Sequence, residues 1–136
     1  MIVILSCGQR KQAERSRAKD LYTGPYFRAA LAYATSRVAL ERIFILSAKY
    51  GLLALEDRVD PYELKLGQPG SVTVEKARQQ ARQLGLLPVT DVMMVIAGKK
   101  YQDFLMGVFE TGFLMPCTGG IGQQIQWLRA HTKETK

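Results

Sequence analysis

Residues 43–53 read I-F-I-L-S-A-K-Y-G-L-L. The first five, Ile43–Ser47, show no alternation of apolar and polar side chains, which is typical of a strand covered on both faces in a parallel sheet. Residues 2–6 and 92–97 have the same character and predict two more such strands. Gly51 follows the strand predicted over residues 43–47, at a position that indicates a left-handed backbone turn.

Four segments between and after these strands have helical character. Pro25 suits the first turn of one helix, and Gly85 follows another as its carboxyl-terminal cap. The expected helices cover residues 26–40, 73–84, 100–108 and 123–130. Strands that alternate with helices predict an α/β fold, with a short, mostly parallel sheet flanked by helices. We expect a single domain over residues 1–136, with a polar C-terminal tail at about 131–136.

The composition is that of a globular protein with a basic surface. Of 136 residues, 19 are Lys or Arg and 12 are Asp or Glu, so the net charge is +7. This excess attracts polyanions such as nucleic acid or nucleotides, although a basic surface without such a partner is an equally simple interpretation. Hydrophobic residues make up 47% of the chain, which excludes a disordered tail protein. No run approaches the ~20 consecutive apolar residues of a membrane span. No signal segment precedes the first strand, so we expect no membrane partner and a cytoplasmic location.

Cysteine and histidine are scarce. Cys7 and Cys117 form no C-x-x-C pair; a disulfide between them is arithmetically possible, but nothing else indicates a secreted scaffold. Zinc needs more sulfur or histidine ligands than the chain offers, so we expect neither a metal nor a cofactor. The single histidine, His131, falls in the polar tail, where we expect it to be solvated. A mechanism with a histidine general base is therefore disfavoured.

Two long segments, residues 7–24 and 48–70, show no regular pattern. Connections of this length inside a small domain are uncommon and often functional. Each follows the C-terminal end of a predicted strand, which is the edge where open α/β sheets bind ligands. We therefore expect a binding site at this edge of the sheet.

The first segment begins with a candidate anion site. Ser6 and the backbone N–H groups after it can contact an anion, and Lys11 supplies positive charge. Cys7 is either a nucleophile or a small buried filler, and no histidine lies near it in the sequence to activate it. The basic residues that follow either hold a phosphate backbone or form a solvated surface. They are Arg10, Arg15, Arg17 and Lys19, and the segment ends with Asp20 and Tyr22.

The second segment combines tyrosines with acidic residues. Lys49 and Tyr50 leave the strand beside the Cys7 segment, and Tyr62 lies further along the chain. A carboxylate can stabilise an oxocarbenium ion on a sugar, while a tyrosine stacks on a base. A plain surface loop is the alternative interpretation. The carboxylates of this stretch are Glu56, Asp57, Asp60 and Glu63.

Gly98 and Tyr101 mark a third candidate, where a predicted strand meets the amino end of a helix. Free N–H groups and the helix dipole favour an anion there, and Lys99 and Lys100 add positive charge. The glycine-rich residues 119–122 offer a similar helix start. No G-K-[ST] follows them, so this is not a Walker phosphate-binding loop.

The order of the motifs resembles a bacterial and phage family of uncharacterised domains. The motifs are S-C-x-x-x-K, D-L-Y-x-x-x-x-F, I-L-S-A-K-Y-G-L-L, D-x-x-x-P-Y and A-G-x-x-Y. The portion with L-S-A-K-Y-G-L-L and D-x-x-x-P-Y is also similar to the peroxide-stress protein YaaA family. The Cys7/Lys11 segment more distantly resembles a domain of archaeosine tRNA-modifying enzymes. These resemblances imply an α/β fold and a role near DNA or RNA, at nucleobases.

Three functions are compatible with these features. The first is an enzyme that cleaves or exchanges the N-glycosidic bond of a nucleobase or nucleoside, with Asp57 or Asp60 beside the sugar. The second is a non-catalytic basic module that binds nucleic acid, and the third is a nucleotide sensor. The expected catalytic residues are Asp57, Asp60, Lys49 and Cys7. The expected substrate-binding residues are Ser6, Lys11, Asp20, Tyr22, Tyr50, Gly51, Tyr62, Gly98 and Tyr101.

Overall fold

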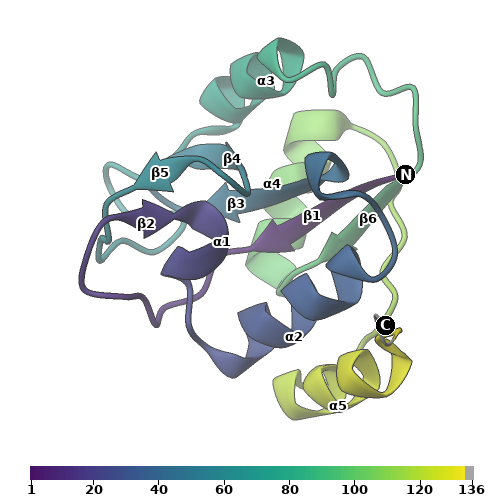
Figure 1. Ribbon diagram of the computed structural model, residues 1–136. Coiled ribbons are helices and arrows are strands. Elements are labelled where there is room, and N and C mark those ends of the chain that lie inside the picture. Colours follow the sequence, from purple (N-terminus) through teal and green to yellow (C-terminus); the bar gives the residue numbers. More distant parts are fainter. Residues whose placement is uncertain (134–136) are drawn as a thin grey trace.

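The computed structural model describes residues 1–133 and is built on a sheet of four strands in the order β4-β3-β1-β6 (Figure 1). β1 pairs in parallel with both β3 and β6, whereas β4 runs antiparallel to β3. The predicted mostly parallel sheet is therefore confirmed. The strands are β1 (Ile2–Ser6), β3 (Ile43–Ser47), β4 (Gly51–Ala54) and β6 (Met93–Ile96).

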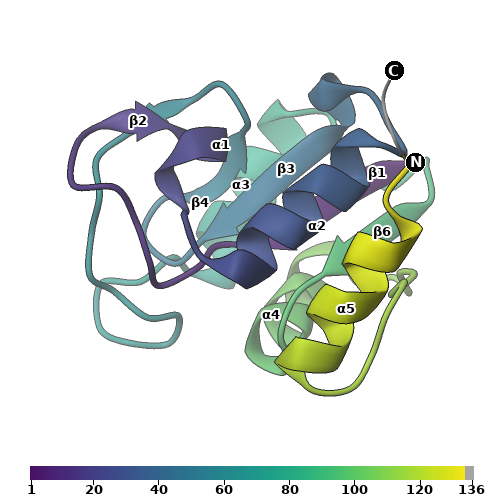
Figure 2. The same ribbon diagram turned by 60° about the horizontal axis from the view of Figure 1, so that its bottom comes forward.

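Two layers of helices cover the sheet, one on each face (Figures 1 and 2). α2 (Pro25–Thr35) and α5 (Ile121–His131) form one layer, and α3 (Val74–Gln83) and α4 (Lys99–Phe109) form the other. Every residue of β1 and β3 is buried. The absence of alternation in these two strands follows from this arrangement, because both faces of each strand pack against apolar side chains.

Side chains join the two helices within each layer. The ring of Tyr33 in α2 contacts that of Trp127 in α5, with centroids 5.4 Å apart. In the other layer, Arg78 of α3 donates a hydrogen bond to the Gly107 carbonyl of α4 at 2.9 Å. The four predicted helices are confirmed, with Pro25 as the first residue of α2.

α2 is shorter than predicted, because the expectation of a helix as far as residue 40 is wrong. The Ser36 hydroxyl donates to the Tyr33 carbonyl at 2.7 Å, so a side chain competes with the helical backbone pattern just after the last helical residue. Arg37 folds back over Tyr33, with its guanidinium 5.2 Å from the ring centroid. A short 3₁₀ helix, η1 (Leu40–Arg42), then leads into β3.

Both segments that were expected to be irregular contain short elements. The first holds β2 (Ser16–Arg17) and α1 (Ala18–Leu21), and the second holds β4 and β5 (Arg58–Val59). β2 and β5 pair as a small antiparallel sheet, which lies beyond the carboxyl ends of β1 and β3 (Figure 1). These elements are too short to show a period in the sequence, and β2 and β5 exist only because distant segments meet.

α5 ends at the first residue of the polar C-terminal tail that the sequence predicts at about 131–136. His131 is the last residue of α5, and its exposed imidazole stacks on the indole of Trp127, with centroids 3.9 Å apart and an interplanar angle of 11°. A histidine one helical turn after a tryptophan lies on the same helix face, so this contact follows from local geometry. Residues 134–136 of the predicted tail lie outside the described residues.

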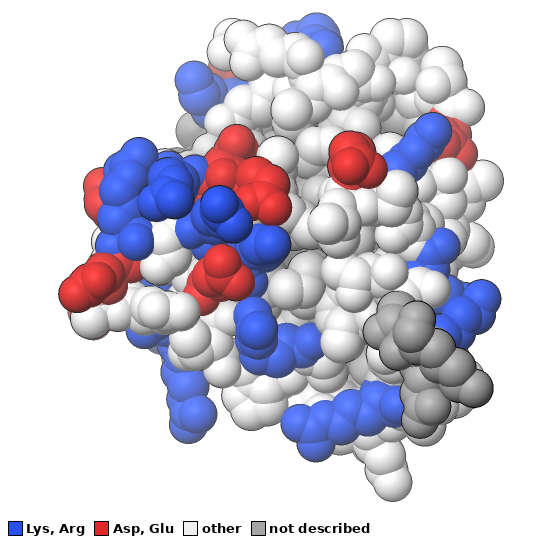
Figure 3. All heavy atoms as spheres, in the orientation of Figure 1, with Lys and Arg blue, Asp and Glu red and all other residues white. Residues whose placement is uncertain are grey.

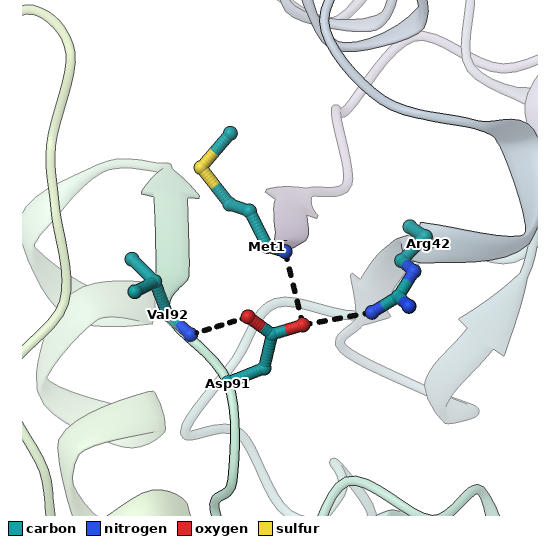
Figure 4. Close-up of polar contacts among 4 residues, drawn as sticks. All are labelled: Met1, Arg42, Asp91 and Val92. Carbon is teal, nitrogen blue, oxygen red and sulfur yellow. Dashed lines mark hydrogen bonds and ion pairs between the residues drawn. The ribbon is translucent and has the colours of Figure 1, made fainter.

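An ion cluster joins the starts of the three parallel strands (Figure 4). The Asp91 carboxylate accepts hydrogen bonds from the Met1 ammonium at 2.9 Å and from Arg42 at 2.8 Å. Its other oxygen accepts from the Val92 N–H at 2.8 Å. The bond from the ammonium is the main cause that lowers the pKa of the Asp91 carboxyl, and the Val92 N–H adds to it.

Replacing Asp91 with asparagine is expected to lower the thermal midpoint of unfolding near neutral pH, because the charge that pairs with Met1 and Arg42 is lost. The native carboxyl titrates below its ordinary pKa of 3.8, so its contribution is complete above that value and disappears as the pH falls through the native pKa. Calorimetric scans at about pH 7 and about pH 3 measure this difference. If the thermal midpoints of wild type and variant differ by the same amount at both pH values, the ionised Asp91 carboxylate does not stabilise the fold through these ion pairs.

Candidate functional site

The carboxyl end of β1 is a topological switch point of the sheet. β1 lies between β3 and β6, and the chain passes from β1 to β3 on one side and later reaches β6 on the other. Open α/β sheets bind ligands in the crevice at such a point. Cys7 directly follows β1 here, and Gly98 is the cap residue before α4.

Cys7 and Tyr101 meet across this point. The Cys7 N–H donates to the Leu46 carbonyl of β3 at 3.0 Å, which continues the ladder and fixes the position of the thiol. The half-buried thiol lies 3.3 Å from the Tyr101 hydroxyl in the first turn of α4. Ser6, the residue before, is buried at the end of β1. The structure therefore brings together residues that belong to separate sequence motifs.

Three buried hydroxyl groups form a continuous chain at the carboxyl end of β3. The Ser47 hydroxyl donates to Tyr62 Oη at 2.8 Å, and the Tyr62 and Tyr22 hydroxyl oxygens are also 2.8 Å apart. Ser47 Oγ in turn accepts the N–H groups of Lys49 (3.2 Å) and Tyr50 (3.0 Å), which turns the chain from β3 into β4. Ser47 was not predicted as a site residue, although a serine that ends an apolar strand before a turn is a recognisable signal.

The tyrosine rings around this network pack edge to face. The ring centroids of Tyr50 and Tyr62 are 5.5 Å apart, and those of Tyr22 and Tyr62 are 6.4 Å apart. Burial raises the pKa of Tyr22, Tyr62 and Tyr101 above the ordinary value of 10.0, and charge on the nearby Cys7 sulfur acts in the same direction. These hydroxyls therefore keep their protons at neutral pH and act as hydrogen-bond donors.

Lys11 lies over this aromatic cluster. Its ammonium is 4.4 Å from the centroid of the Tyr62 ring and 5.9 Å from that of Tyr22, and it donates to the Gln9 carbonyl at 3.0 Å. Desolvation lowers the pKa of the Lys11 ammonium, while charges on Cys7 and Glu63 oppose that shift. A cation over a ring face is held by the ring quadrupole, so Lys11 is positioned before any ligand arrives.

Lys49 lies next to the same rings. Its ammonium is 5.3 Å from the centroid of Tyr50, whose ring contacts Tyr62. The Tyr50 hydroxyl donates to the Asp60 backbone carbonyl at 3.1 Å, which ties the ring to the segment after β5. Two lysines from distant segments therefore lie beside one pair of touching tyrosines.

A cleft opens beside Lys11, with a volume of about 420 Å³. This volume is in the range of small-molecule sites. We call it the Lys11 cleft; its walls come from Gln9, Lys11, Glu63, Leu64, Lys65 and Gln68. Glu63 is the only carboxylate on these walls, and sequence reasoning did not choose it among the four carboxylates of its segment. Its position directly after Tyr62 was the available signal.

The three aspartates predicted for the site do not line the Lys11 cleft. The exposed Asp57 carboxylate accepts the Ala54 N–H at 2.9 Å and closes the turn after β4. The Asp60 carboxylate pairs with Arg15 at 3.2 Å, and its side chain is 60% exposed. Asp20 is exposed on α1 and lines a different groove. The Asp57 carboxylate bonds back to its own turn, and the Asp20 and Asp60 carboxylates are exposed, so none of the three is a wall of the Lys11 cleft.

The two glycines predicted for the site have different surroundings. Gly98 precedes α4, and no side chain caps the first N–H groups of that helix. The Lys99 ammonium pairs with Asp103 of the same helix at 3.0 Å. Gly51 has the predicted left-handed conformation, with φ of 79°, and lies against the Gln80 side chain of α3. Gly51 therefore serves the packing of β4 on α3.

Basic residues gather over β2, β5 and α1, with acidic residues among them (Figure 3). Glu56 pairs with both Arg17 (3.2 Å) and Lys19 (3.3 Å), and Arg15 pairs with Asp60. Part of the positive charge predicted for phosphate contact is thus offset by carboxylates in the same region. At the start of α5, Gln123 accepts the Gly120 N–H at 3.1 Å, so a side chain already occupies that helix start.

Residues 1–133 contain neither a cluster of metal ligands nor a helix that could span a membrane. No three His, Cys, Asp or Glu side chains lie close enough together there to hold a metal ion. No helix in this range is both long and apolar enough to cross a membrane.

The fold and the residues around the carboxyl ends of β1 and β3 define an α/β protein with a polar and aromatic site at that edge of its sheet. The chain belongs to a family of unknown function, DUF6884, which matches residues 2–130. No curated protein and no solved structure matches the chain. The predicted membership of an uncharacterised domain family is confirmed, whereas the links to the YaaA family and to archaeosine tRNA-modifying enzymes stay predictions.

Proposed function

We propose that the chain is an enzyme that binds a nucleobase or nucleoside unit at the carboxyl edge of the sheet and acts on its N-glycosidic bond, in or near nucleic acid. The observation that carries this proposal is the position of Lys11. Its ammonium lies over the Tyr22 and Tyr62 rings and on the wall of the Lys11 cleft, so one residue joins the aromatic cluster to an open cavity.

Each part of the site supplies a function that this chemistry needs. Lys11 and Lys49 hold the phosphate, and the half-buried ring of Tyr50 offers a face on which a base stacks. Breaking the bond leaves positive charge on the sugar ring, which a nearby carboxylate stabilises. Glu63 takes this role in place of Asp57 and Asp60, because it lies on the cleft wall.

The proposed reaction is a hydrolysis. The bond between C1′ of the sugar and the base nitrogen breaks, and the base leaves with the electron pair. Water adds its hydroxyl to C1′ and its proton goes to the base. The half-buried Cys7 thiol and the Tyr101 hydroxyl, 3.3 Å apart, lie at the switch point and are the groups available to orient the base or to carry its proton.

Replacing Lys11 with methionine is expected to lower kcat/KM for base release by at least about tenfold, because the charge that holds the phosphate is lost while the volume is kept. Glu63→Gln is expected to lower kcat by a similar factor. Chromatography of the free base released from a panel of modified nucleosides and single-stranded oligonucleotides measures both. Asp60→Asn is the control and is expected to keep wild-type activity. Release of no base from any substrate would refute the proposal, as would an Asp60→Asn variant weaker than Glu63→Gln.

A non-catalytic nucleic-acid-binding module is the second candidate. It is favoured by the basic residues over β2, β5 and α1 (Figure 3). It predicts binding that weakens steeply with salt, and no product under any condition. Base release that depends on Lys11 and Glu63 separates the enzyme from the module.

A further inference from the structure

A second cavity, with a volume of about 500 Å³, lies behind the segment that carries Lys11. We call it the arginine groove; its walls come from Gln12, Ser16, Arg17, Asp20, Thr23, Arg28 and Arg58. Three guanidinium groups thus face one carboxylate, that of Asp20. This imbalance gives the groove a positive potential, which attracts an anion.

Two of these arginines lie directly opposite each other. Arg17 of β2 and Arg58 of β5 are paired residues in the small antiparallel sheet. Like charges at directly opposed positions are destabilising, and a two-residue ribbon has few other contacts to offset the repulsion. Arg17 has a partner in Glu56 at 3.2 Å, whereas Arg58 has no carboxylate partner among residues 1–133. A ligand with negative charge would relieve this repulsion.

The amino end of α2 adds to the positive potential. Thr23 and Arg28 of the groove wall lie on either side of Gly24, the cap residue of this eleven-residue helix. No side chain caps its first N–H groups, so the positive end of the helix dipole is not neutralised there. The Arg28 guanidinium is held in place because it donates to the Lys19 carbonyl at 3.0 Å.

The arginine groove and the Lys11 cleft lie on two sides of one extended segment. Lys11 forms a bridge with Tyr22, and the Gln12 N–H donates to the Leu21 carbonyl at 2.9 Å. Neighbouring side chains of an extended chain point to opposite sides. Lys11 therefore lies over the tyrosines while Gln12 lines the groove, so a ligand in the groove is held close to the Lys11 site.

We infer that the arginine groove binds the phosphodiester backbone of a single-stranded nucleic acid, so that the enzyme acts on a polynucleotide rather than on a free nucleoside. This inference rests on the proposed function. Guanidinium groups bind phosphate through two parallel hydrogen bonds, and such contacts position a strand without reading its sequence. A single strand fits because the base must leave its stack to reach the half-buried Cys7 and Tyr101.

The test compares two double variants that remove the same charge. Arg17→Gln with Arg58→Gln changes the groove, and Arg82→Gln with Arg129→Gln removes two exposed arginines of α3 and α5 outside it. Fluorescence anisotropy with labelled DNA and RNA strands of about 12 nucleotides gives the affinity at several salt concentrations. The groove variant is expected to bind both strands at least about tenfold more weakly near 0.1 M salt, and the control variant less than about threefold.

The salt dependence supplies a second readout. The slope of log affinity against log salt is expected to fall by about 1.4 in the groove variant, which is about 0.7 for each lost phosphate contact on a single strand. Binding of a nucleoside monophosphate at the Lys11 cleft is expected to stay within about twofold of wild type. The inference would be overturned if the two double variants lost equal affinity for the strands. It would also be overturned if the wild-type protein bound the monophosphate as tightly as the strand.

Failure of the inference and failure of the proposed reaction have different signatures. The reaction fails if no base is released or if Lys11→Met and Glu63→Gln have no effect. The groove assignment fails if strand affinity does not depend on Arg17 and Arg58, whatever the outcome for base release.

Discussion

Gly51→Ala is expected to lower the free energy of unfolding by about 3 kcal/mol, of which the left-handed backbone accounts for about 1–2 kcal/mol. Gly51 has φ of 79°, and a Cβ atom there would collide with Gln80 Oε1. The Gln80 amide accepts the Leu52 N–H at 2.8 Å and donates to the Tyr50 carbonyl at 2.8 Å. An alanine at position 51 would push this side chain away and break both bonds, each worth about 1 kcal/mol.

Urea denaturation of the wild type and of Gly51→Ala measures this loss. Gly67→Ala is the matched control, because Gly67 also has a positive φ of 93° but no atom lies within 4 Å of an added Cβ. The control therefore carries the backbone strain without the collision with Gln80. If the two variants lose the same stability, the contact between β4 and α3 through Gln80 does not hold the strand in place.

The second large effect is expected for Tyr62→Phe, which should destabilise the fold by about 2 kcal/mol. The change removes one oxygen and leaves the Ser47 hydroxyl without its acceptor and the Tyr22 hydroxyl without its partner. Ser47 and Tyr22 are fully buried, so no water replaces the lost contacts. The cost of burying an unpaired polar group is larger than the net gain from the original hydrogen bond.

Tyr50→Phe serves as the comparison for this network. The Tyr50 hydroxyl donates to the Asp60 carbonyl near the surface, at 3.1 Å, where water can take its place. This variant is expected to lose less than about 1 kcal/mol in the same urea titration. Equal losses for the two tyrosines would mean that the Ser47 and Tyr22 hydroxyls find other partners. Because the Tyr62 ring remains in the phenylalanine variant, Lys11 keeps its position over an aromatic face.

Interactions between neighbours in the sequence made most of the fold predictable. The unbroken apolar runs of β1 and β3, the Gly85 cap after α3 and the turn at Gly51 each depend on residues close together in the chain. The predicted end of α2, at residue 40, was wrong. The helix stops at Thr35, and the Ser36 hydroxyl donates to the Tyr33 carbonyl just after it. Propensity alone does not reveal that competition.

The site was predictable to the extent that parallel strands end at one edge of a sheet. Cys7 and Lys11 follow β1, Tyr62 follows β5 and Tyr101 lies in α4, and the structure places all four close together. The choice among carboxylates was not predictable in the same way. Asp57 and Glu63 lie in one loop, and only the path of that loop over the sheet edge turns Glu63 to the cleft and Asp57 to its own turn.

The amino-acid sequence by itself determined the layered α/β architecture, the family of the chain and the edge of the sheet where polar residues collect. Those properties follow from the unbroken apolar runs, from the helical segments between them and from the order of the motifs, all of which are read along the chain. Only the tertiary structure decided that β4 joins the sheet, that Arg17 faces Arg58 and that Ser47, Tyr22 and Tyr62 share hydrogen bonds. Each of these contacts joins residues that the chain brings together only when the whole core is packed, so no local pattern encodes them.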